Sequence, residues 1–74
     1  MLLTDIDGKR WKLWNRIHAD RIRDAQMYIG YQITPHCSQL NLSEEDGDCP
    51  AIGLTLPNHL ADDWMAGKIK IKVR

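Results

Sequence analysis

The chain has 74 residues, of which 10 are Lys or Arg and 10 are Asp or Glu, so its formal net charge at pH 7 is zero. This length allows one domain, which we take as residues 1–74. Hydrophobic residues make up 43% and charged residues 27%, an ordinary globular composition. The composition therefore excludes a disordered tail, a collagen-like repeat and a histone-like cationic protein.

The start of the chain, Met1 to Asp5, lacks the basic region and the apolar region of a signal peptide. No apolar run approaches the roughly 18 residues of a membrane span. We therefore expect a cytoplasmic location and no membrane partner. A reducing cytoplasm makes free thiols the default for Cys37 and Cys49, with a disulfide or a metal site as the alternatives.

A β-hairpin is expected at the N-terminus. Asp7-Gly8 is typical of a two-residue type I′ turn, which needs positive φ at both central positions. Pairing outward from this turn places Thr4 opposite Trp11. One face of the hairpin then carries Leu2, Thr4, Ile6, Trp11 and Leu13.

A helix is predicted after the hairpin. Asn15 can cap a helix that begins at Arg16 and runs to about Gln26, and the charges of Arg16, Asp20 and Arg23 have helical spacing. Apolar residues then alternate over residues 27–33, which predicts a strand that Pro35 ends.

The second half of the chain predicts more strands and one more helix. Apolar residues alternate at 39–42 and again at 51–56. Pro57 begins a second helix, which Gly67 ends. Residues 68–74 alternate basic with β-branched side chains and form the clearest predicted strand. The order β-β-α-β-β-β-α-β predicts an α+β domain with a mostly antiparallel sheet and two short helices.

Charge is distributed unevenly along the chain. Residues 1–25 hold six basic and four acidic side chains, residues 26–66 hold six acidic ones and no Lys or Arg, and the remainder hold four basic ones. The acidic set consists of Glu44, Glu45, Asp46, Asp48, Asp62 and Asp63. The C-terminal cations are Lys68, Lys70, Lys72 and Arg74. Each group is a candidate binding surface, unless the basic ends pack beside the acidic middle and neutralise it.

Patterns for catalysis or metal binding are weak. The zinc-competent side chains lack C-x-x-C and H-x₃₋₅-H spacing; they are His36, Cys37, Cys49 and His59. Residues 44–48 lack the twelve-residue calcium loop. No nucleophile, base and orienting group form a recognisable pattern, and so small a core leaves little room for a substrate pocket. We expect no enzyme activity, no cofactor and no metal site.

These observations favour a non-catalytic binding protein that regulates or inhibits a macromolecular partner through protein–protein contacts. Its size is typical of viral and prophage accessory proteins, including anti-defence proteins. The acidic set is the predicted contact surface, with Trp14 or Tyr31 as an aromatic anchor. The alternative is a small nucleic-acid-binding domain that uses the C-terminal cations. Lysines on an edge strand also discourage aggregation, and a homodimer formed through that strand is compatible with either function.

Overall fold

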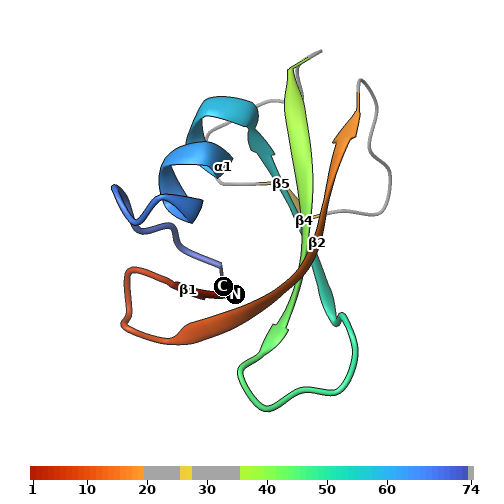
Figure 1. Cartoon of the computed structure of the whole chain (residues 1–74), viewed down its shortest axis with the longest axis vertical. Helices are drawn as coiled ribbons and strands as arrows, with labels where there is room; N and C mark the ends of the chain where they lie inside the picture. The colour runs from red at the N-terminus through yellow and green to blue at the C-terminus, as the bar shows by residue number, and fades with distance from the viewer. Residues whose placement is uncertain (20–25, 28–35, 74) are drawn as a thin grey trace.

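One sheet with a helix against one of its faces makes up the part of the chain that the structure describes (Figure 1). The computed structural model describes residues 1–19, 26–27 and 36–73. The strand order is β1-β2-β4-β5-β3, in which the first four strands are antiparallel and β3 is parallel to β5. The elements are β1 (Leu2–Thr4), β2 (Arg10–Ala19), β3 (Gln26–Met27), β4 (Cys37–Glu44), β5 (Ile52–Pro57) and α1 (Asn58–Met65).

The α+β class is confirmed in this coarse form, whereas the predicted number and order of elements are not. The predicted strands at 39–42 and 51–56 correspond to β4 and β5, and the helix after Pro57 is α1. Gly67 ends this helix in the left-handed region, with φ of +77°. Its N–H and that of Lys68 donate to the carbonyl groups of Trp64 and Asp63, the Schellman arrangement.

The predicted helix that begins at Arg16 is wrong for the residues that can be compared. Residues 15–19 belong to β2 and pair with residues 37–41 of β4. A bulge between Leu13 and Asn15 explains the error, because the extra residue interrupts the alternation by which a strand is recognised.

The remainder of that helix and most of the predicted strand at 27–33 lie outside the described residues. Within this region the structure describes Gln26–Met27, which form β3 beside β5.

The N-terminal hairpin forms, but its predicted register is wrong by one residue. Thr4 pairs with Arg10 and Leu3 with Trp11, because the loop contains three residues instead of two. The N–H of Gly8 donates to the carbonyl of Asp5, and Gly8 has φ of +84°. A three-residue loop that ends on a left-handed glycine uses the same Asp-Gly sequence as the two-residue turn.

The register decides which side chains of the hairpin are buried. Leu3 and Trp11 are 3% and 1% exposed, whereas Leu2 and Ile6, which the predicted register places on the same face as Trp11, are 45% and 53% exposed. The hairpin therefore contributes Leu3 and the ring of Trp11 to the core, and leaves the aliphatic side chains of Leu2 and Ile6 in solvent.

The carboxylate of Asp5 holds this loop together although it is only 4% exposed. Its Oδ1 accepts hydrogen bonds from the backbone N–H groups of Asp7 and Lys9, both at 2.9 Å. Its Oδ2 accepts the indole Nε1–H of Trp11 at 2.8 Å. Burial by itself would raise the pKa of Asp5, but the bonds from Trp11, Lys9 and Asp7 and the charge of Lys9 outweigh it. The pKa of Asp5 therefore lies below its ordinary value of 3.8.

The core lies between α1 and the face of the sheet that α1 covers, which we call the inner face. Strands β4 and β5 direct alternate leucines into it, and α1 contributes Ala61 and Trp64. Because paired residues share a face, the residues that alternate with these leucines in β4 and β5 lie on the opposite, outer face, whereas Ser38 and Ile52 share the inner face with the leucines. The leucines of the core are Leu40, Leu42, Leu54 and Leu56, each at most 1% exposed.

The C-terminal segment, residues 68–73, runs back to the outer edge of β1. Asp5 and Ile71 form a parallel bridge, and the N–H of Ile6 donates to the carbonyl of Ile71 at 3.2 Å. Ile71 and Val73 are each 1% exposed, so the predicted alternation is confirmed. The predicted strand is not confirmed, because the backbone of the described part of this segment pairs with the sheet only at that bridge.

Replacing Asp5 by Asn should lower the free energy of unfolding at pH 7 by about 1–3 kcal/mol, because an uncharged amide cannot accept all three hydrogen bonds. A depressed pKa stabilises the fold above the unfolded pKa, and this contribution disappears as the pH falls through the folded pKa. The difference between wild type and Asp5→Asn should therefore shrink below about pH 4. Urea unfolding at pH 7 and pH 3 measures both effects.

The matched control is Asp7→Asn, which changes an exposed carboxylate in the same loop. It should change the stability by no more than about 0.5 kcal/mol. Equal effects of the two variants, or a difference that does not depend on pH, would contradict the role given to Asp5.

Candidate binding surfaces

The acidic set is divided between two places in the fold. Four of its members lie in or beside the turn between β4 and β5, at the lower end of the sheet in Figure 1, and Asp62 and Asp63 lie on α1, beside the upper part (Figure 1). Glu44 pairs with Lys9 at 2.7 Å, and Glu45 pairs with Arg10 at 2.9 Å. The hairpin thus neutralises half of the charge of this turn.

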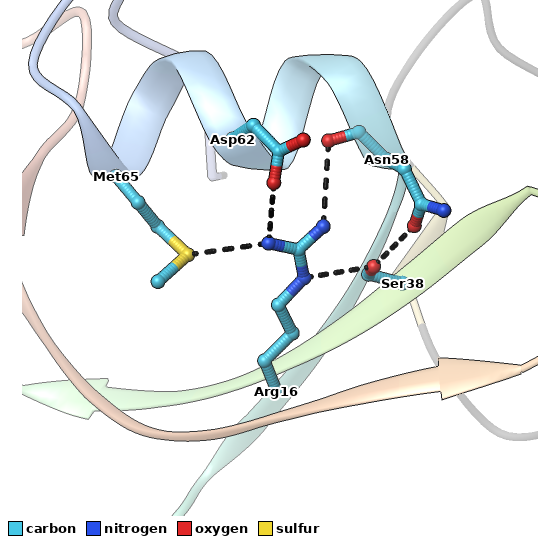
Figure 2. A network of polar contacts seen from close by, with 5 residues as sticks. All are labelled: Arg16, Ser38, Asn58, Asp62 and Met65. Atoms are coloured by element: carbon cyan, nitrogen blue, oxygen red, sulfur yellow. Dashed lines mark hydrogen bonds and ion pairs between the residues drawn. The ribbon is translucent and has the colours of Figure 1, made fainter.

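The charge of Asp62 is also compensated within the chain (Figure 2). Arg16 extends from β2 to α1, where its guanidinium donates to Asp62 Oδ1 at 2.6 Å. Its Nε donates to Ser38 Oγ at 2.9 Å, and a further N–H group faces the carbonyl of Asn58 at 3.4 Å. Ser38 in turn donates to the side chain of Asn58. Arg16 therefore connects β2, β4 and α1, and its role is to stabilise the fold.

The acidic set as a whole does not form one charged surface. Three of its six members are in ion pairs, as expected if the basic beginning of the chain packs beside the acidic middle. Among the described residues, Asp46, Asp48 and Asp63 have no ion pair, but Asp63 is on a different element from the other two.

Trp14 lies on the outer face of the sheet and is 40% exposed. Its Nε1–H donates to Ser43 Oγ at 2.8 Å, and the ammonium of Lys12 lies 5.1 Å from the centre of its ring. Lys12 is itself fixed by a 2.8 Å hydrogen bond to the carbonyl of Gly47. Ile17, also on the outer face, is 42% exposed. We call the exposed group of Trp14, Asn15 and Ile17 the Trp14 patch.

A row of amide side chains, which sequence reasoning missed, continues the outer face across β2 and β4. Gln39 donates to Asn41 at 3.1 Å, and Asn41 donates to Asn15 at 2.8 Å. A Cβ at Gly53 would overlap the amide nitrogen of Gln39, so this glycine allows the amide to lie across β5. The alternation of polar and leucine side chains over residues 39–42 was the signal for this row, but the predicted helix makes Asn15 a cap and so does not place it on a sheet.

The C-terminal cations remain in solvent where the structure describes them. Lys68, Lys70 and Lys72 are exposed and, within the described residues, have no ion pair. Arg74 and the second aromatic candidate, Tyr31, lie outside the described residues.

The two cysteines lie at different places along β4 and the turn after it. Cys37, at the start of β4, is buried, and Cys49, beyond the end of β4, is exposed; both are free thiols. Within residues 1–19, 26–27 and 36–73, no three metal-binding side chains of His, Cys, Asp or Glu come together. In the same residues no helix has the length and apolar character needed to cross a membrane.

Comparison with protein-family models, with curated proteins and with solved structures finds no match.

Replacing Arg16 by Met should lower the free energy of unfolding by about 1–3 kcal/mol, because several hydrogen bonds to a charged donor are lost from a side chain only 15% exposed. Asp62→Asn should cost less than about 1 kcal/mol, since the Asp62 side chain is 62% exposed and solvent replaces the pair. Urea unfolding followed by circular dichroism measures both. Equal costs would show that the ion pair, and not the wider network, is what stabilises this region.

Proposed function

We propose that the protein is a non-catalytic binding protein that regulates or inhibits a partner protein, and that its principal contact is the Trp14 patch. The observation that carries this proposal is a large indole that is exposed and at the same time held in one position by Ser43 and Lys12. Exposed aromatic side chains of this kind dominate the binding energy of many protein interfaces.

The energetic argument concerns the cost of ordering a side chain on binding. A mobile side chain loses roughly 0.5–1.5 kcal/mol of conformational freedom when an interface immobilises it. Trp14 has already lost part of that freedom, because its N–H is bonded and its ring is in contact with an ammonium group. Ile17 adds apolar area, and Asn15 and Asn41 add hydrogen-bonding groups at the polar side of the patch.

The acidic set has a smaller part in this proposal than the sequence predicted. Within the described residues, its internal ion pairs leave Asp46 and Asp48, in the turn after β4, and Asp63 on α1 as the charges available to a partner. Charges at the rim of an interface mainly affect orientation and the rate of association. A non-catalytic protein can affect its partner only by covering part of the partner's surface. We therefore propose that binding regulates or inhibits the partner protein.

The test is a pull-down from host-cell lysate with the tagged full chain, with and without nuclease, analysed by mass spectrometry. Trp14→Ala should lose a stoichiometric, nuclease-resistant protein partner, by about 100-fold in affinity once that partner is purified. The fold should lose only about 1 kcal/mol, since the side chain is partly exposed. Trp14→Phe keeps a ring and should retain part of the binding.

Ile6→Ala is the matched control, because Ile6 is an exposed aliphatic side chain outside the patch. It should bind as wild type does. Retention of the partner by Trp14→Ala would exclude this surface. A partner set that disappears with nuclease would instead favour the alternative function, nucleic-acid binding through the C-terminal cations.

A further inference from the structure

A cleft of about 210 Å³ lies between the outer edge of β1 and the chain that follows α1. Leu2 and Thr4 line one side, and Met65, Ile69 and Lys70 line the other. Small-molecule sites usually begin at roughly 300 Å³. This cleft is therefore better suited to one apolar side chain of a larger partner than to a free small molecule.

The edge of β1 beside the cleft offers backbone groups to such a partner. β1 is the terminal strand of the sheet, and hydrogen bonds from the described chain reach its outer side at Thr4 and just beyond the strand at Ile6. The indole Nε1–H of Trp64 donates to the carbonyl of Thr4 at 2.8 Å, and the Ile6 N–H donates to Ile71. Toward Leu2 the described residues supply no further backbone partner on that side. A strand edge with unpaired backbone groups can pair with an extended peptide.

The surroundings of the cleft are positively charged. Lys70 lines it, and Lys68 and Lys72 lie two residues away on the exposed side of the same segment. These three lysines have no ion pair within the described residues, although three other cations of the chain each hold a carboxylate. The complementary ligand is therefore one with several carboxylates near an apolar group.

We infer that the cleft and these lysines bind an extended acidic segment of a partner protein, with one bulky apolar side chain in the cleft. A nucleic acid would satisfy the lysines but not the cleft, because Trp64 is 2% exposed and offers no ring face for a base. This site lies at the β1 edge and does not involve the Trp14 patch, so it goes beyond the proposed function and can fail independently of it.

The direct test is NMR titration of the labelled full chain with a synthetic peptide that has one leucine between two runs of glutamate. A second peptide has serine in place of the leucine. The leucine peptide should shift the indole N–H resonance of Trp64, at the wall of the cleft, and leave that of Trp14 unchanged. The serine peptide should bind about tenfold more weakly, because no apolar group fills the cleft.

Two pairs of variants separate the cleft from general charge. Leu2→Ser and Lys70→Gln should each weaken the leucine peptide about three- to tenfold. Their matched controls, Ile6→Ser and Lys9→Gln, change an exposed aliphatic and an exposed lysine whose side chains do not line the cleft. Both controls should leave the affinity within about twofold of wild type.

Three results would overturn the inference. Equal affinity for the two peptides would mean that charge alone is recognised. Absence of a saturable shift at Trp64 would remove the cleft from the binding site. Tighter binding of a thymidine oligonucleotide than of the leucine peptide, with a steep dependence on salt, would assign the lysines to nucleic acid.

Discussion

The buried carboxylate of Asp5 is the group on which the arrangement of the chain depends. By accepting the N–H groups of Asp7 and Lys9 it fixes a three-residue loop, and by accepting the indole of Trp11 it fixes which residue of β2 faces the core. A charge in this position would be costly without its three donors, whereas with them it is a strong local constraint. The same loop then directs the N–H of Ile6 to the C-terminal segment.

A second constraint acts further along β2, where the bulge at Trp14 changes the direction of the side chains. Trp11 and Leu13 point to the inner face before the bulge, and Arg16 points to it afterwards. Arg16 therefore reaches α1 and is used for the fold, while Trp14 stays on the outer face with its N–H bonded to Ser43. A single inserted residue thus separates the structural cation from the exposed aromatic ring.

These two constraints explain what could and could not be predicted from the sequence. The alternation of leucines in β4 and β5, the proline and glycine that bound α1, and the alternation of residues 68–73 are local signals, and the structure confirms them. The register of the hairpin could not be predicted from the local sequence, because Asp7-Gly8 occurs both in two-residue turns and in three-residue loops that end on a left-handed glycine. The donors to Asp5 decide between them, and these exist only in the folded hairpin.

The strand conformation of residues 15–19 and the ion pairs of the acidic set could not be predicted from the sequence for a related reason, because both depend on residues far away in the chain. The partners of residues 15–19 lie 18 to 26 residues further along the chain, so the helix-spaced charges near Arg16 predicted a helix where the structure has a strand. The charge segments correctly indicated that basic and acidic parts could neutralise each other, but not which carboxylates would be used. Pairing at Glu44, Glu45 and Asp62 leaves the Trp14 patch and the C-terminal lysines as the more available surfaces.

The most direct measurement is an NMR determination of the cross-strand contacts in the N-terminal hairpin of the full chain. A three-residue loop fixed by Asp5 predicts close α-protons for Thr4 with Arg10 and for Leu2 with Lys12, which are the non-hydrogen-bonded pairs of this register. Contacts that instead pair Thr4 with Trp11 and Leu2 with Leu13 would show a two-residue turn. That result would contradict the role of Asp5, and with it the burial of Leu3 and the position of the cleft beside β1.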